Sequence, residues 1–295
     1  MKVLVTGSQG SVGRYVIRTL LDAGHEVLGL GRKPRQREEP FVYFSTDISQ
    51  QDAVEAVARQ SGALDAVVHC AAHISYDDAD SQLMLVNAAG TQNIVTLAKQ
   101  CGAGKVVYLS SIPVIGTPSI LPIAEDHPLA PRTMYHVSKL TGEYIVRASG
   151  LGYTILRIAS PVGPGMSPRT IVPVFLSRCL AQEPLFLHGS GGRIQNYISL
   201  LDVARAVLLS LNGEDGCYHL AGDSLSNWDL AVLCKKITGS RSEILFSGQP
   251  DPEERNRWEV SGEKARAQLG FVPQVGIETS LRMMIDSGQR EETIQ

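Results

Sequence analysis

The chain opens with Met1-Lys2-Val3-Leu4-Val5-Thr6-Gly7-Ser8-Gln9-Gly10-Ser11-Val12-Gly13, and this stretch decides the fold. The apolar run Val3–Val5 predicts a short buried strand, and the apolar spacing from Val12 onward predicts a helix. Glycines between the two let the backbone turn sharply and approach a phosphate, and the first N–H groups of the helix then face the anion. The stretch therefore predicts a dinucleotide site at Gly7, Gln9, Gly10, Ser11, Val12 and Gly13.

The pattern of strand and helix continues through the first half of the chain. Each expected strand is a brief run that is apolar on both faces, as in a parallel sheet covered by helices. Helical spacing fills the intervals, so we expect a doubly wound parallel α/β (Rossmann) sheet. The expected strands are Val3–Val5, Glu26–Leu30, Phe41–Phe44, Ala66–Cys70, Val106–Leu109 and Tyr153–Leu156.

The sequence pattern changes after Ser160, because prolines and glycines there interrupt regular structure. We expect a dinucleotide-binding domain over residues 1–160 and a smaller mixed α/β substrate lobe over 161–286, from which the chain also returns to the first domain. A helix is expected over Ile277–Ile285, and Ser287–Gln295 is expected to be a frayed polar tail.

Composition excludes several classes of protein. The 295 residues are 43% hydrophobic and 19% charged, and the formal net charge of −3 gives no reason to expect nucleic acid or a membrane surface as partner. The five cysteines form no Cys-x-x-Cys pair, which indicates neither a metal site nor a disulfide framework. Without an apolar run long enough for a signal peptide or a bilayer span, we expect a cytoplasmic protein with reduced thiols.

The end of the second expected strand bears on the choice of cofactor. A carboxylate expected there for the ribose hydroxyls of NAD is replaced by Gly31 and Arg32. Because a guanidinium can grip a 2′-phosphate, this favours NADP, with NAD left open. Alternatively, Arg32, Lys33, Arg35 and Arg37 form only a solvated basic loop. Asp47 and Ile48 are expected to border the adenine, although Asp47 could instead cap the next helix.

Tyr135 is followed four residues later by Lys139, so a helix would place both on one face. A neighbouring ammonium lowers the pKa of a phenol and suits it to exchange a proton with a carbinol or carbonyl. Ser111, at the end of an expected strand, could polarise the reacting oxygen. Asn87 could orient the site or touch the cofactor, and packing is the competing interpretation.

These stretches resemble the extended short-chain dehydrogenases/reductases of the NAD-dependent epimerase/dehydratase group. The resemblance implies that Ser111, Tyr135 and Lys139 are catalytic, that Lys139 also holds the nicotinamide ribose, and that Ala71 and Ala72 line the inner face of the cofactor. It further implies a nucleotide-activated sugar as substrate and a homodimer through a pair of helices. The matching segments are TGSQGSVG (6–13), DI (47–48), VVHCAA (67–72), NAAGTQNIV (87–95), VVYLSS (106–111), YHVSK (135–139), LRIASPVGPG (156–165), HGSGGRIQNYISLLDVARAV (188–207) and LGFVP (269–273).

Departures from the family pattern disfavour one reaction of the family and change the expected substrate contacts. The Asp-Glu pair with which family dehydratases remove water is replaced by Ile112-Pro113, which lacks an acid or a base. An asparagine usual near the substrate is replaced by Ser160, and the usual Arg-Asp-Phe by Gln195-Asn196-Tyr197. Arg193 is then the residue expected to reach a diphosphate, with Ser111 and Ser160 as further substrate contacts.

Three functions follow. The first is keto-sugar reduction or C4 epimerisation of a nucleotide-activated sugar, by hydride transfer with Tyr135 as acid and base. The second keeps this chemistry for a small non-nucleotide ketone or aldehyde, with NADPH as reductant. The third is a non-catalytic protein that senses dinucleotide, which the retained tyrosine and lysine disfavour.

Overall fold

The computed structural model describes residues 1–34 and 40–292 of the chain. Their central feature is a seven-stranded sheet, ordered β10-β6-β5-β4-β1-β2-β3, in which every neighbouring pair is parallel. This order confirms the predicted doubly wound Rossmann sheet. The strands are β1 (Lys2–Thr6), β2 (Glu26–Gly31), β3 (Val42–Ser45), β4 (Ala66–His69), β5 (Lys105–Ser111), β6 (Gly152–Ile158) and β10 (Gly216–Leu220).

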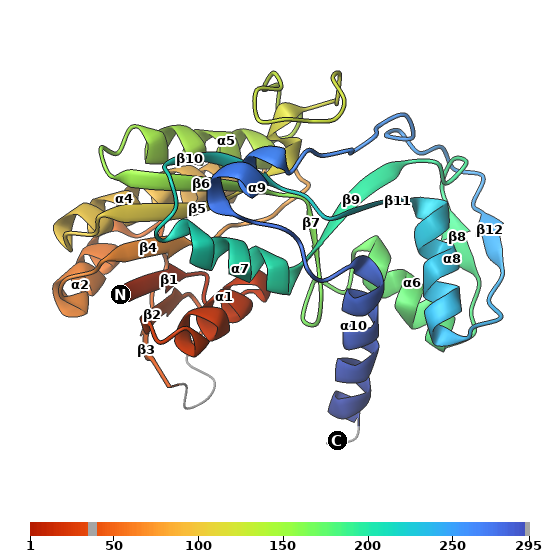
Figure 1. Cartoon of the computed structure of the whole chain (residues 1–295), viewed down its shortest axis with the longest axis horizontal. Helices are drawn as coiled ribbons and strands as arrows, with labels where there is room; N and C mark the ends of the chain where they lie inside the picture. Colours follow the sequence, from red (N-terminus) through yellow and green to blue (C-terminus); the bar gives the residue numbers. More distant parts are fainter. Residues whose placement is uncertain (35–39, 293–295) are drawn as a thin grey trace.

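Helices cover both faces of the sheet, as Figure 1 shows. On one face α1 (Ser11–Asp22) and α7 (Leu200–Ser210) pack together over an apolar core, with α9 (Glu263–Leu269) beside α7. The other face is covered by α2 (Gln51–Ser61), α4 (Gly90–Gln100) and α5 (Met134–Arg147) over a second core. Apolar side chains on both sides of each strand explain why the strands read as continuous apolar runs.

A second lobe follows β6 and lies beside the sheet in Figure 1. Its own apolar core is distinct from the two that flank the sheet. The chain leaves this lobe to supply α7 and β10 to the first domain. The lobe contains β7 (Ser160–Val162), β9 (Ile194–Ser199) and β11 (Asp223–Ser226) in one sheet, β8 (Leu185–Leu187) and β12 (Ile244–Phe246) in another, and α6 (Ile171–Leu180), α8 (Asn227–Thr238) and α10 (Ile277–Glu292).

The last helix is longer than the sequence pattern predicts. α10 runs from Ile277 to Glu292, so most of the expected polar tail is helical, and residues 293–295 lie outside the described part of the chain. The apolar pattern ends near Ile285, but the following Gln, Arg and Glu are good helix formers and allow the helix to continue. No helix within residues 1–34 and 40–292 is long and apolar enough to cross a bilayer.

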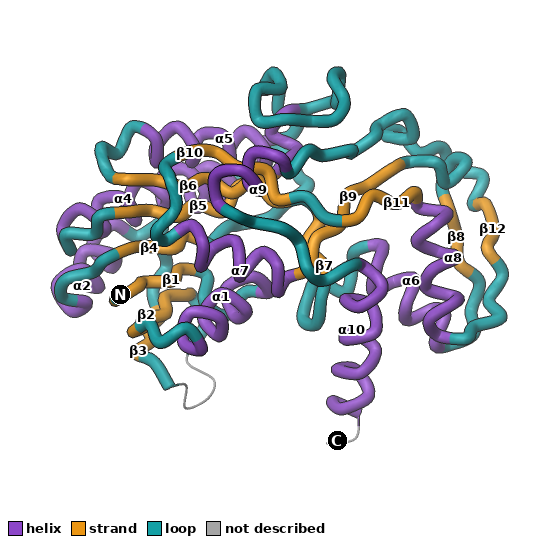
Figure 2. The backbone as a smooth tube through the Cα atoms, in the orientation of Figure 1, coloured by secondary structure: helices purple, strands orange, loops and turns teal. Residues whose placement is uncertain are grey.

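Two short irregular helices stand at the edge of the sheet where the strands end. The helical segment between β4 and β5 is broken into α3 (Gln82–Met84), a π-helical turn η1 (Leu85–Ala89) and α4. A 3₁₀ turn, η2 (Ile112–Ile115), follows β5 directly. Figure 2 shows the long loop that connects η2 to α5. Since π-helical turns are rare and occur mostly at functional sites, η1 points to this edge.

The glycine turn is fixed by contacts that leave no room for side chains. A Cβ on Gly13 would lie 2.1 Å from the carbonyl oxygen of Gly7. Gly7 has a φ of +65°, and a Cβ there would lie 2.7 Å from the backbone nitrogen of Ala71. The amide of Gly10 donates to the carbonyl of Gly7 at 2.8 Å and closes the turn. α1 is therefore pressed against the end of β1.

Gly13→Ala is expected to lower the free energy of unfolding by about 2–3 kcal/mol, because the added methyl must push α1 away from the turn. Urea unfolding measures the change. Gly104→Ala is the matched control, since its Cβ would meet no atom nearer than 3.8 Å. A Gly13 variant as stable as the control would contradict this account of the turn.

Candidate active site

A cavity of about 240 Å³ opens between the glycine turn and the ends of β2 and β4. It lies where the order of the sheet reverses, between β1 and β4, which is where ligands bind in open α/β folds. Predicted residues from four separate segments meet here. The cavity is lined by Gly7, Gln9, Gly10, Leu30, Gly31, Arg32, Lys33, Thr46, Ile48, Cys70, Ala71, Ala72 and Val86.

The phosphate end of the cavity is built from the turn. Ser11 is the first residue of α1, and Gly10 stands at its N-cap without a side-chain cap. The N–H groups of Ser11, Val12 and Gly13 belong to the first turn of the helix, where N–H groups have no partner within the helix. This arrangement fits a pyrophosphate, and the exposed Gly10 lets it approach closely.

At the end of β2, Arg32 and Lys33 are exposed on the cavity wall. Arg35 and Arg37, which complete the basic cluster in the sequence, lie outside the described residues. The residues that line the cavity thus include two cationic side chains and no carboxylate. This set suits a negatively charged group on the adenosine ribose.

The two residues after β3 have different positions. Ile48 lines the cavity and packs against Gly90, where a Cβ would lie 2.8 Å from its side chain. Asp47 is absent from the lining, and its carboxylate accepts hydrogen bonds from the backbone and hydroxyl of Ser49 at 2.9 and 2.8 Å. Asp47 thus closes the turn before α2 but does not cap the helix, whose N-cap is Gln50 without a side-chain hydrogen bond.

The two hydroxyls at the end of β5 separate into two roles. Ser110 is buried and donates to Oε1 of the buried Glu143 at 2.6 Å. Ser111 is half-buried at the last position of the strand. Because successive side chains of a strand point to opposite faces, the engaged Ser110 leaves Ser111 on the other side of β5. The structure thus singles out Ser111 as the hydroxyl available to a ligand.

Tyr135 lies in the first turn of α5, which is held at both its cap and its backbone. The hydroxyl of Thr133 caps the helix, and Asp78 Oδ1 accepts from the amide of Met134 at 2.7 Å. Burial raises the pKa of Tyr135 to about 12, with a smaller contribution from the nearby Tyr76. Lys139 is not among the groups that shift this pKa, so acidification of the phenol by Lys139 stays a prediction.

The side chain of Lys139 is buried against the ring of Tyr108. It is 3% exposed, and Nζ lies 4.2 Å from the centre of the Tyr108 ring. Burial lowers the pKa of Lys139 to about 8, while Glu143 and Cys70 oppose the shift. The ammonium therefore lies against the face of an aromatic ring, one helical turn beyond Tyr135 along α5.

Asn87, on η1, links the loop after β4 to α5. Its Oδ1 accepts from the amide of His73 at 2.7 Å. Its Nδ2 donates to the carbonyl of His73 at 2.8 Å and to Ser138 Oγ at 2.9 Å. Both amide hydrogens are thus used within the protein, which agrees with an orienting role, and contact with the cofactor stays a prediction. Asn87 positions the loop against the helix that carries Tyr135.

A hydrogen-bonded chain beneath the cavity was not predicted. Thr91 Oγ1 donates to the carbonyl of Asn87 at 2.6 Å, so it accepts from Nε2 of His69 at 3.0 Å. Nδ1 of His69 therefore accepts from Thr6 Oγ1, which in turn accepts from the amide of Ala71. Burial lowers the pKa of His69 to about 3, which keeps the ring neutral. The chain fixes β1 and β4 at the cavity floor.

A second unpredicted feature is a buried ion pair behind α5. Glu143 accepts from Nε and Nη2 of Arg157 at 2.9 and 2.8 Å, and both side chains are almost without exposure. Glu143 stands one helical turn beyond Lys139 and two beyond Tyr135, so the spacing along α5 is the sequence signal that could have revealed it. The pair locks α5 to β6.

The residues expected to hold substrate do not form a cluster of free groups. Ser160 begins β7 and is half-buried. Arg193 is paired with Asp251 and Glu253 at 3.3 and 3.1 Å, across the loop that precedes β9. The guanidinium expected to grip a diphosphate is thus already neutralised by two carboxylates.

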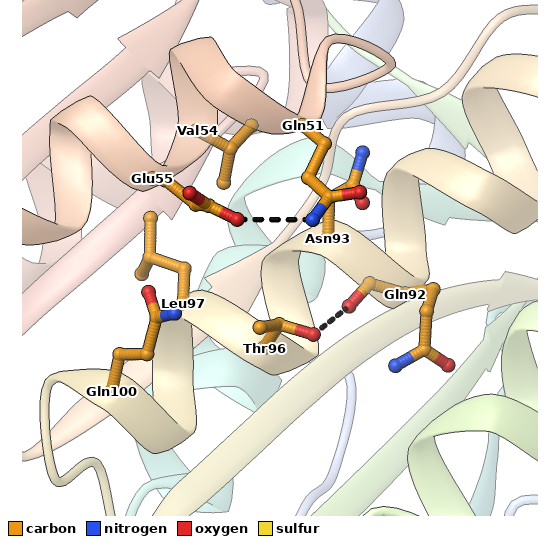
Figure 3. Close-up of a pocket in the computed structure, with 8 residues that line it drawn as sticks. All are labelled: Gln51, Val54, Glu55, Gln92, Asn93, Thr96, Leu97 and Gln100. Carbon is orange, nitrogen blue, oxygen red and sulfur yellow. Dashed lines mark hydrogen bonds between the residues drawn. The ribbon is translucent and has the colours of Figure 1, made fainter.

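Another groove, of about 110 Å³, lies between α2 and α4. Figure 3 shows its polar rim, where Gln51 donates to Glu55 at 2.9 Å. None of the predicted catalytic or cofactor residues lines it, and its one carboxylate, that of Glu55, accepts the hydrogen bond from Gln51. Within the described part of the chain, no three His, Cys, Asp or Glu side chains gather as metal ligands would.

The sheet order and the cavity at its switch point define a Rossmann-fold enzyme that uses a nicotinamide dinucleotide. A family model of the NAD dependent epimerase/dehydratase family matches residues 3–219. The chain belongs to this family.

Individual relatives agree over nearly the full length. The UDP-glucose 4-epimerase of Corynebacterium glutamicum is 27% identical and covers 97% of this chain and 94% of its own. A dTDP-glucose 4,6-dehydratase of Streptomyces niveus is 26% identical, with 95% and 90% covered. The structure of Thermus thermophilus UDP-glucose 4-epimerase in complex with NAD superimposes with a TM-score of 0.87 at 26% identity, over 98% and 99% of the two chains.

Lys139→Met is expected to raise the free energy of unfolding at pH 7 by about 2 kcal/mol, because it removes a buried charge whose pKa has fallen from 10.5 to about 8. Below pH 8 both the folded and unfolded states hold the proton, and the full penalty is present. Between pH 8 and 10.5 the unfolded state binds more protons, so the wild type gains stability as pH rises.

Urea unfolding of wild type and Lys139→Met between pH 7 and 10.5 measures the difference. The advantage of the variant should shrink as pH rises through this window. An advantage that is constant or grows would show that Lys139 carries no burial penalty.

Proposed function

We propose that the protein catalyses hydride transfer at a carbinol or ketone of a nucleotide-activated sugar, as a keto-sugar reductase or C4 epimerase. The observation that carries this proposal is the cavity at the carboxyl edge of the sheet, together with the packing of α5, which carries Tyr135, against β5, which ends at Ser111. Family membership supports the dinucleotide chemistry, and relatives named for UDP- and dTDP-glucose support the substrate class.

Three residues of this chain have separate roles in the proposed reaction. A bound nicotinamide supplies or accepts the hydride. Tyr135 exchanges the proton of the substrate oxygen, and Ser111 donates a hydrogen bond to that oxygen. Because burial holds the pKa of Tyr135 near 12, proton removal needs a nearby positive charge, and Lys139 is the ammonium on the same helix that can provide it.

Dehydration is disfavoured relative to reduction and epimerisation. Ile112 and Pro113 form the start of η2, directly after Ser111, and Ile112 is buried. An elimination at the sugar needs a second acid and base at the ring, and these two side chains supply neither. The relatives include both epimerases and dehydratases, and the side chains of η2 support an activity like that of the first group.

A small ketone or aldehyde is the second candidate substrate. The observation that favours it is Arg193, whose charge is already paired with Asp251 and Glu253. A diphosphate at this point would have to displace two carboxylates, whereas a neutral ketone would not.

For the cofactor we propose NADP, with NAD also accepted. Arg32 and Lys33 line the cavity at the end of β2, where neither faces a carboxylate in the lining. A 2′-phosphate placed there would meet two cations. The matching structure with bound NAD and the name of the family support NAD in the same cleft.

We also propose a cytoplasmic location. The five cysteines, Cys70, Cys101, Cys179, Cys217 and Cys234, are all free thiols, as is usual in a reducing compartment. Cell fractionation tests this proposal.

For assembly we propose a homodimer through the paired outer faces of α4 and α5. A groove of about 320 Å³ runs between them, and Tyr144 is 57% exposed at its edge. Light scattering is expected to give twice the chain mass of 31.9 kDa. Tyr144→Glu should shift the mass to that of one chain, and a wild type that is already monomeric would exclude this dimer.

The function is tested with UDP-glucose, UDP-galactose and the corresponding dTDP sugars, each incubated with NAD or NADPH and followed by chromatography and absorbance at 340 nm. Conversion of one of these sugars is expected. Tyr135→Phe should reduce turnover about 10²–10⁴-fold while the Kd for NADPH stays within about twofold, because only the proton carrier is removed.

Turnover of simple ketones with no binding of any nucleotide sugar would shift the assignment to the second candidate. Near-normal turnover by Tyr135→Phe would exclude the mechanism for either substrate.

A further inference from the structure

The glycine turn carries a side chain with an unsatisfied polar atom. Gln9 lines the cofactor cavity, and its Nε2 donates to the carbonyl of Pro34 at 3.2 Å. This bond identifies which end of the amide is nitrogen and therefore fixes the position of the oxygen. Oε1 is buried and has no hydrogen-bond partner among the described residues. Because a buried acceptor without a donor is costly, a ligand hydroxyl that donates to it would be favoured.

The place of this oxygen is informative. It lies 3.7 Å from the point where a Cβ on Gly31 would stand. That point is also 3.0 Å from the hydroxyl of Tyr43, so a side chain at residue 31 would be crowded by the tyrosine. Gly31 has no side chain and supplies no acceptor for a ribose hydroxyl at the end of β2. Gln9 brings an acceptor to the same place from the glycine turn.

We propose that Gln9 accepts a hydrogen bond from the 2′-hydroxyl of NAD, while Arg32 binds the 2′-phosphate of NADP, so that two residues set the two cofactor affinities separately. The inference rests on the proposed dinucleotide chemistry and adds the determinant of cofactor choice. A hydroxyl has a proton to donate to Oε1. A phosphate monoester is largely without one at neutral pH, and its oxygens repel a carbonyl oxygen.

The experiment measures the Kd of NADH and of NADPH without substrate, by nicotinamide fluorescence and calorimetry. Gln9→Ala should weaken NADH about 3- to 10-fold and leave NADPH unchanged or tighter, because only one neutral hydrogen bond is lost. Arg32→Ala should weaken NADPH about tenfold or more and leave NADH within about twofold. The opposite responses of the two variants are the signature of the proposal.

Two further variants sharpen the test. Gln9→Glu keeps an acceptor and adds a negative charge, so NADH should be retained while NADPH weakens. Gln100→Ala is the matched control, since Gln100 lies on α4 in the separate groove of Figure 3 and should alter neither affinity. Thermal unfolding of each variant shows whether the fold is kept, and Gln9→Glu replaces Gln9→Ala as the decisive variant if the latter unfolds.

Equal weakening of both cofactors by Gln9→Ala would place the side chain on a group that the two share and overturn the proposal. Unchanged NADH binding in Gln9→Ala, or unchanged NADPH binding in Gln9→Glu, would do the same. If the wild type binds neither dinucleotide, the proposed function itself fails, which is a different result from wild-type binding without discrimination by Gln9.

Discussion

The close approach of the first helix to the first turn is the constraint on which the rest depends. With the Cβ position of Gly13 only 2.1 Å from the Gly7 carbonyl, α1 begins directly at the end of β1. Gly7 in turn touches the backbone of Ala71 after β4. One backbone contact thus joins the two strands that flank the switch point, and the cavity opens between them. Larger residues at either glycine would separate the walls of the site.

The catalytic edge is supported from behind by buried polar groups. The Glu143–Arg157 pair holds α5 on β6, and Ser110 ties β5 to the same carboxylate. Removing one partner of such a pair leaves an unpaired charge in the core. This destabilises the fold far more than burial of the intact pair does. Lys139 lies nearby over the ring of Tyr108, where its ammonium is shielded from water. The ion pair that holds α5 in place and the buried ammonium on the same helix both suit Tyr135 to carry a proton.

Local patterns in the sequence were enough for the sheet and for the floor of the cavity. Apolar runs predicted the strands, and Gly7, Arg32, Ile48 and Ala71 meet at one cavity as expected. Properties that depend on packing could not be predicted in this way. The pKa of Tyr135 is set by burial, which sequence spacing does not show. Arg193 is neutralised by carboxylates about sixty positions away, and no local pattern brings those residues together.

The central claim is that the phenol of Tyr135 faces the nicotinamide of a dinucleotide held by the glycine turn. A crystal structure of the protein with bound NADH or NADPH tests it most directly. We expect the pyrophosphate against the first N–H groups of α1 and the nicotinamide ring next to Tyr135, with the ammonium of Lys139 turned from Tyr108 toward the ribose. A dinucleotide bound elsewhere, or a nicotinamide on the far side of the sheet from Tyr135, would contradict the account.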